Sequence, residues 1–217
     1  MALVVTDALV LRTVEFAESD LVVHLLTPDR GRWAAIAKGA RRSKKRFPGA
    51  LDLFHLVRLH ADRRPGRMAR LDGAVLLDAH AALRRDPVRF AIGCTLLELM
   101  GRLAPEGAAP PDARRLFAFA LDALRTIASS KPDARLRLWI ELRALDALGL
   151  RPEFRCCVRC GDALRASERV GFLIADGGPV CGACGVCLDG LLPVHQGTLR
   201  ALEQSLCFEL ARLPRLV

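Results

Sequence analysis

DLVVHLLTPDRGRWAAIAKG, residues 20–39, determines how the first part of this chain is interpreted. The stretch contains two runs of apolar and β-branched residues, which favour β-strands. Between the runs stands TPDRG, residues 27–31, a turn signal in which proline fixes φ and glycine accepts a positive φ. The two runs are therefore predicted to be successive β-strands joined by a turn.

The same pattern continues on both sides of this stretch, from residue 3 to about residue 78. Five short strand-like runs are recognisable: VTDALVLRTV, DLVVHLLT, GRWAAIAKG, LDLFHLVRLHA and ARLDGAVLLDA. A second turn signal, RPG at residues 64–66, separates the last two runs. Five strands in so short a length predict a small barrel over residues 1–80.

Helical periodicity replaces the strand pattern from residue 81 to about residue 155. Three segments carry apolar residues at i, i+3 and i+4 spacing: DPVRFAIGCTLLELMGRLA, DARRLFAFALDALRTIAS and PDARLRLWIELRALDALGL. Asp-Pro or Pro-Asp pairs mark the three starts, and Gly149 is expected to end the third helix. A last helix is predicted in HQGTLRALEQSLCFELARL, within residues 191–217, packing back on this helical domain.

A cysteine-rich insert over residues 156–190 interrupts the helical part. Two Cys-x-x-Cys pairs stand twenty residues apart, and such paired knuckles direct four sulfurs to one tetrahedral metal ion. Two symmetric knuckles result if the ligands are Cys157, Cys160, Cys181 and Cys184. Cys156 and Cys187 are alternatives, because the first adjoins a knuckle and the second forms another Cys-x-x-Cys pair with Cys184. The sequence predicts one structural Zn²⁺ ion.

Four thiolate ligands leave no open coordination position, so the predicted zinc is not catalytic. A zinc deaminase needs a His-x-Glu element, and no histidine of this chain is followed two residues later by glutamate. The sequence also lacks a Gly-rich phosphate-binding loop and a G-x-S-x-G element. We therefore expect a protein that is not an enzyme.

A basic segment follows the third predicted strand. Five of the six residues at positions 41–46 are cationic, and the formal net charge of the chain is +9. Dense positive charge favours a polyanion such as nucleic acid. Loops flank the binding groove of oligonucleotide-binding barrels, so a cationic loop here is expected to contact phosphates. Trp33 and Phe47 are the candidates for base stacking.

The amino terminus lacks the basic start and small-residue cleavage site of a signal peptide, and no apolar run reaches the length of a membrane span. A cytoplasmic protein without membrane contact is therefore expected. Thiols stay reduced in that compartment, which favours metal ligands or buried thiols over disulfides.

Residues 10–59, including KGARR and the following GAL-x-x-F, closely resemble the amino-terminal domain of the bacterial RecO recombination-mediator family. ELRALDALGLRPEF, CVRCG and GGPVCGACG resemble later parts of that family. The resemblance implies an α+β protein with a five-stranded OB-fold barrel, a helical domain and a four-cysteine zinc-finger insert. Many relatives continue past the last helix, whereas this sequence stops at Val217, so the resemblance implies no function of a terminal extension here.

The resemblance also implies a function in DNA repair, in the bacterial cytoplasm at the nucleoid. Such proteins bind single- and double-stranded DNA and anneal complementary strands. With RecR they help load RecA onto DNA coated by single-stranded-DNA-binding protein, whose carboxyl tail they recognise. By the match of motifs, the phosphate-contacting residues are Lys38, Arg41, Arg42, Lys44, Lys45 and Arg46. For the partner tail, the candidates are Arg137 and Arg143, which flank Trp139 on the third helix.

Two other functions fit a barrel combined with a zinc ribbon. One is an RNA-binding or transcription-associated module, because charge alone does not separate DNA from RNA. The other is a metal-dependent nucleic-acid enzyme, which a chelator would inactivate. The family resemblance favours the recombination mediator.

Overall fold

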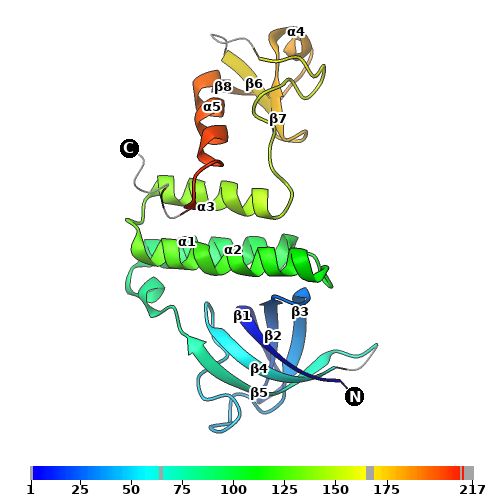
Figure 1. Cartoon of the computed structure of the whole chain (residues 1–217), viewed down its shortest axis with the longest axis vertical. Helices are drawn as coiled ribbons and strands as arrows, with labels where there is room; N and C mark the ends of the chain where they lie inside the picture. Colours follow the sequence, from blue (N-terminus) through cyan, green and yellow to red (C-terminus); the bar gives the residue numbers. More distant parts are fainter. Residues whose placement is uncertain (1, 64–65, 165–168, 211, 213–217) are drawn as a thin grey trace. The chain divides into compact units, whose positions relative to one another are not determined.

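A computed structural model describes residues 2–63, 66–164, 169–210 and 212 (Figure 1). Its internal contacts divide the chain into two compact units, Met1–Ala144 and Leu145–Val217. The four-part division expected from the sequence, 1–80, 81–155, 156–190 and 191–217, stays a prediction.

The first unit begins with the predicted barrel. Its strands are β1 (Ala2–Phe16), β2 (Asp20–Thr27), β3 (Gly31–Ala37), β4 (Leu56–Arg63) and β5 (Ala69–Asp78). They close in the order β1-β2-β3-β5-β4. All neighbours are antiparallel except β3 and β5, whose parallel pairing of Ala35 with Ala69 completes the ring. The α+β class with an amino-terminal five-stranded barrel is confirmed.

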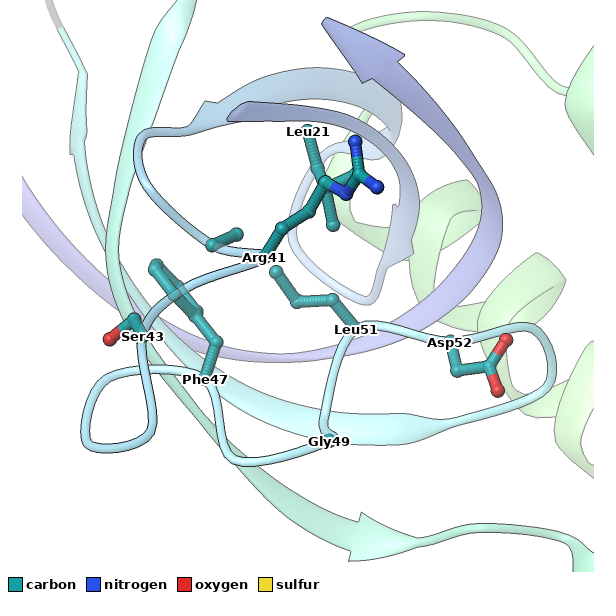
Figure 2. A pocket seen from close by; sticks show the side chains of 8 residues that line it. Leu21, Arg41, Ser43, Phe47, Gly49, Leu51 and Asp52 are labelled. Atoms are coloured by element: carbon teal, nitrogen blue, oxygen red, sulfur yellow. The ribbon is translucent and has the colours of Figure 1, made fainter. Parts of the chain in front are cut away.

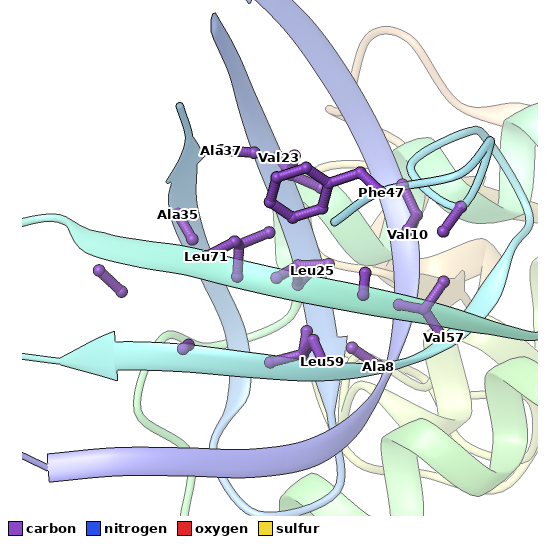
Figure 3. Close-up of a cluster of buried hydrophobic side chains, with 14 of the residues drawn as sticks. Ala8, Val10, Val23, Leu25, Ala35, Ala37, Phe47, Val57, Leu59 and Leu71 are labelled. Atoms are coloured by element: carbon purple, nitrogen blue, oxygen red, sulfur yellow. The ribbon is translucent and has the colours of Figure 1, made fainter. Parts of the chain in front are cut away.

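Alternation along the strands places one set of side chains inside the barrel. In β3 every second residue is buried, beginning with Gly31, which is the period of a strand with one face in a core. Figure 3 shows the resulting cluster, in which Val23, Leu25, Leu59 and Leu71 converge from three strands. All four side chains are fully buried, so the barrel is held by a continuous apolar core.

The connection between β3 and β4 is longer than expected. The predicted fourth strand began at residue 51, but β4 begins at Leu56. Phe54 explains the difference, because its φ of 69° is incompatible with a strand. Its buried ring meets Phe90 edge-to-face, with the centroids 5.3 Å apart. Residues 51–55 therefore belong to the loop that anchors the barrel to the helices.

A short 3₁₀ helix, η1 (Ala81–Arg85), leads into α1 (Pro87–Leu103), α2 (Pro110–Ser129) and α3 (Ala134–Ala147). The predicted starts are confirmed. The Asp86 carboxylate accepts a hydrogen bond from the N–H of Arg89 at 2.9 Å, and that of Asp133 accepts from the N–H of Leu136 at 2.9 Å. Both aspartates satisfy amides that the first turn leaves unpaired.

The first residues of β3 contact the connection between α1 and α2. The Arg32 guanidinium donates to the carbonyl of Ala104 at 3.0 Å and pairs with Glu106 at 3.0 Å. Gly31 has a φ of +66°, and a Cβ there would lie 2.9 Å from the carbonyl oxygen of Pro105. Glycine is required at this position both for its backbone conformation and for the close approach.

The second unit contains a small sheet in the order β7-β6-β8. Its elements are β6 (Arg169–Leu173), β7 (Gly178–Val180), α4 (Gly182–Gly185), β8 (Leu192–His195) and α5 (Gln196–Ser205). The sequence did not predict β8, and the last helix is shorter than expected because it ends at Ser205. The packing of α5 on the helical domain stays a prediction.

No helix within the described part of the chain is both long and apolar enough to cross a membrane.

Candidate functional site

The second unit gathers four cysteine sulfurs at one point. Each of the four contributes one Sγ atom, and these atoms all lie within 4.8 Å of one another: Cys157, Cys160, Cys181 and Cys184. The Sγ atoms of Cys160 and Cys181 are 3.9 Å apart. A tetrahedral ion with metal–sulfur bonds of about 2.3 Å requires sulfur–sulfur distances of this size.

Each Cys-x-x-Cys pair is closed by the same backbone hydrogen bond. The N–H of Gly161 donates to the carbonyl of Cys157 at 2.8 Å, and that of Gly185 donates to the carbonyl of Cys181 at 2.9 Å. Gly161 has a φ of 80°, which favours glycine directly after the knuckle. The local sequence therefore bends both pairs in the same way, as paired metal knuckles require.

The electrostatics of the cluster favour a cation. Burial raises the pKa of Cys157, but backbone N–H groups, first that of Cys181, outweigh burial and hold this pKa at about 6. The N–H of Asp162 lowers the pKa of Cys160, whereas the neighbouring thiols raise it to about 12. The thiol of Cys181 likewise raises the pKa of Cys184. Four neighbouring thiolates would repel one another, and a divalent ion bound between them would offset that repulsion. The donor set therefore fits Zn²⁺.

The two alternative cysteines lie outside this group of four. Cys156 forms an isolated β-bridge with Ala163, which ties its backbone to the residues after the first knuckle. Cys187 is exposed beyond the end of α4. The structure thus brings together the four sulfurs preferred from the spacing.

The basic loop occupies residues 38–55 of the first unit, between β3 and β4. Its backbone is fixed at several points, including one on β2 and one on β5. The N–H of Gly39 donates to the Asp20 carboxylate at 2.7 Å, and the carbonyl of Arg46 accepts from the N–H of Ala74 at 2.9 Å. Because β2 and β5 hold it, the loop presents its cations from a defined backbone.

Two of the loop arginines are neutralised by glutamates at and just beyond the end of β1. Arg41 pairs with Glu15 at 3.1 Å, and Arg42 pairs with Glu18 at 3.5 Å. These pairs are largely exposed, so they contribute little to stability but lower the local positive charge.

The other cations of the loop have no carboxylate partner among the described residues. The Arg46 guanidinium donates to the carbonyl of Lys38 at 2.6 Å and lies 5.3 Å from the Phe47 ring centroid. The side chains of Lys38, Lys44 and Lys45 are exposed. These three are among only four lysines in the whole chain, the fourth being Lys131.

The stacking role expected of two aromatic residues is wrong. Trp33 is 7% exposed and Phe47 is 4% exposed, and both belong to the barrel core. The indole N–H of Trp33 donates to Thr27 at 3.0 Å inside the barrel, and Figure 3 shows the Phe47 ring pointing into the cluster. Neither ring can therefore meet a base without opening the core.

A hollow of about 370 Å³ lies beneath the loop (Figure 2). Leu21, Leu51 and the edge of Phe47 line its apolar side, and Arg41, Ser43 and Asp52 line its polar side. The loop therefore packs apolar side chains such as Phe47 toward the barrel, while Arg41 borders the hollow.

The two candidate arginines of α3 have different surroundings. Arg137 is exposed and pairs with Glu141 at 2.7 Å in an i, i+4 contact. Arg143 is half-buried and follows Trp139 by four residues, so these two share a helix face. Residues six apart are separated by about 120° around a helix. The two arginines therefore lie on different faces of α3.

Comparison with known proteins identifies two family models. The model described as "Recombination protein O N terminal" matches residues 1–80, and the one described as "Recombination protein O C terminal" matches residues 84–216.

Curated relatives agree with this assignment over most of the chain. A protein of Myxococcus xanthus named "DNA repair protein RecO" is 39% identical over 92% of this chain and 84% of its own length. A protein of the same name from Pelobacter propionicus is 32% identical over 96% of this chain and 82% of its own length. A third protein of this name, from Anaeromyxobacter sp. strain K, is 38% identical over 89% of this chain and 75% of its own length. This chain belongs to the RecO family of DNA repair proteins.

Proposed function

We propose that this chain is a non-catalytic mediator of DNA repair that binds single- and double-stranded DNA and anneals complementary strands. The observation that carries the proposal is the first half of the basic loop, residues 38–46, where Lys38, Lys44 and Lys45 are exposed without a carboxylate partner among the described residues. Annealing brings two polyanions together, and unneutralised cations lower their repulsion without reading the sequence.

The six loop cations do not contribute equally in this proposal. Lys38, Lys44, Lys45 and Arg46 contact phosphates directly. Arg41 and Arg42 first have to exchange Glu15 and Glu18 for phosphate, which reduces the net gain from each. The lysines therefore provide most of the salt-dependent affinity.

One structural Zn²⁺ ion is proposed for the four clustered sulfurs, Cys157, Cys160, Cys181 and Cys184. When bound, the ion cross-links the two knuckles and contributes to the folding free energy of the second unit. Four protein ligands leave no position for a substrate, so this ion takes no part in chemistry.

Partner contacts are inferred from the family. We propose that the chain acts with RecR in the bacterial cytoplasm, at the nucleoid, to help load RecA onto DNA coated by single-stranded-DNA-binding protein. For the carboxyl tail of that protein, the proposed contacts are Arg137 and Arg143, which lie on different faces of α3.

The test is the annealing of complementary oligonucleotides precoated with single-stranded-DNA-binding protein. The wild-type chain is expected to accelerate annealing, and a variant with Lys38, Lys44 and Lys45 changed to Gln is expected to lose most of the acceleration. Lys131→Gln, which removes the one lysine outside the loop, is the matched control. Absence of acceleration on DNA, with tight binding to RNA strands in a parallel assay, would support the RNA-binding alternative instead.

A further inference from the structure

A second hollow, of about 290 Å³, lies on the outer face of the barrel where β3, β5 and β4 are adjacent. Its lining comes from these strands and from the residues that adjoin their ends: Ile36, Lys38, Asp62, Arg67, Met68 and Arg70. Its volume lies just below the roughly 300 Å³ at which pockets for drug-sized molecules begin. It therefore suits a small group.

The registers of the strands explain why these residues meet. Ile36 pairs with Arg70 across β3 and β5, and Arg70 pairs with Asp62 across β5 and β4. These three residues form one row across three strands. Lys38 and Met68 lie just outside the strands, each two residues from a member of the row, and both line the hollow.

Apolar and charged groups are separated within the hollow. Met68 is 56% exposed, although its side chain is large and apolar. Ile36, which also lines the hollow, is half-buried. A thioether and a branched aliphatic chain offer a polarizable apolar surface, which favours contact with an aromatic ring.

Cations surround this apolar surface. The side chains of Lys38, Arg67 and Arg70 are all exposed, and Arg70 has an exposed contact of 3.4 Å with Asp72. The one lining carboxylate belongs to Asp62, which is half-buried. The exposed cations attract phosphate to the edge of the hollow.

We propose that this hollow holds one unstacked base of single-stranded DNA, with the flanking phosphates on Lys38, Arg67 and Arg70. Charge complementarity argues for this occupant, because a nucleotide combines an apolar aromatic ring with an anionic backbone in the same arrangement. The inference rests on the proposed DNA binding and extends it. The loop cations bind any DNA, whereas the hollow accepts only a base that has left its stack.

Lys38 connects the hollow to the basic loop. It lines the hollow, and its carbonyl accepts the hydrogen bond from Arg46 of the basic loop. A strand that follows the loop cations thus reaches the hollow without leaving positively charged surface. Bases of a duplex are paired and stacked, so the hollow distinguishes single-stranded from double-stranded DNA.

The test compares the affinities of three proteins for a short single-stranded oligonucleotide and for its duplex, by fluorescence anisotropy. Met68→Ala removes the apolar surface. Val75→Ala is the matched control, because Val75 is 58% exposed on β5 but does not line the hollow. Met68→Ala is expected to weaken single-strand binding about fivefold, the low end of the effect of removing a stacking side chain. Duplex binding is expected to stay unchanged, and Val75→Ala to change neither affinity.

Unchanged single-strand affinity in Met68→Ala, or an equal decrease on both DNA forms, would overturn the inference. A variant with Lys38, Lys44 and Lys45 changed to Gln separates this failure from failure of the proposed function. If that variant weakens binding to both DNA forms while Met68→Ala changes nothing, DNA binding by the loop stands and only the base site is rejected. If the wild-type protein binds neither form, both proposals are rejected.

Discussion

The barrel and the cysteine-rich unit keep their shapes by different means. The barrel surrounds a continuous core in which Leu25, Leu59 and Leu71 are fully buried. The sheet β7-β6-β8 has short strands, and the residues of β8 are exposed or half-buried. Small folds with little apolar core commonly depend on a metal or on disulfides. The shape of the barrel is therefore expected to be insensitive to its surface charge, whereas the second unit is proposed to depend on its four clustered cysteines.

The strongest effect is expected on the second unit. Replacing Cys157 and Cys181 with Ser is expected to remove the amide protection of residues 145–217 in hydrogen exchange and to leave residues 2–144 protected. The reason is that structural zinc contributes about 10–16 kcal/mol of apparent folding free energy in small domains. Cys207→Ser, which changes an exposed thiol of the same unit, is the control. Retained protection in the double variant would show that the sulfur cluster does not hold this unit.

A core substitution in the barrel tests whether the first unit is stabilised by its apolar core and not by a metal. Leu59→Ala is expected to lower the free energy of unfolding of the first unit by about 2–5 kcal/mol, because it leaves a cavity among fully buried neighbours. Urea unfolding with and without a chelator measures the effect. The decrease is expected to be the same under both conditions, and dependence on the chelator would remove the distinction between the two units.

The loop lysines should alter binding without altering stability. Changing Lys38, Lys44 and Lys45 to Gln is expected to reduce the slope of log affinity against log salt by about 0.7 for each single-strand phosphate that is no longer neutralised. Melting of the barrel should not shift, because all three side chains are exposed. An undiminished slope would exclude the lysines from the binding surface.

A smaller effect concerns the cap of α3. The backbone N–H of Leu136, and then the charge of Arg135, hold the pKa of Asp133 below its ordinary value of 3.8. A lowered pKa means that the cap stabilises the fold above the ordinary value and that this stability disappears as pH falls through the folded pKa. Asp133→Asn should abolish this part of the pH dependence in urea unfolding measured between pH values of about 5 and 3. An unaltered pH profile would show that the carboxylate does not act as the cap.

The parts of the fold that the sequence predicted depend on local signals. The helix starts follow from the capping aspartates at positions 86 and 133, and the barrel strands follow from alternation and turn residues. The cysteine spacing likewise indicated the four sulfurs that meet. In each case the signal lies within a few residues of the structure that it specifies.

The missed features depend on contacts between distant residues. Pairing of Arg41 and Arg42 with Glu15 and Glu18 requires the end of β1 and the loop to lie together, which no local pattern indicates. The burial of Phe47 depends on the path of the loop. The burial of Trp33, in contrast, follows from the alternation along β3 and was predictable from the sequence. The hollow around Met68 requires the register between three strands.

Lysine footprinting is the sharpest test of the basic loop as the DNA-binding surface, because the chain contains only four lysines and three lie in the loop. The protein is acetylated with and without single-stranded DNA, and the extent of reaction at each lysine is measured by mass spectrometry. DNA is expected to protect Lys38, Lys44 and Lys45, while Lys131 reacts equally in both samples. Equal reactivity of the loop lysines with and without bound DNA would contradict the assignment of the basic loop as the DNA-binding surface.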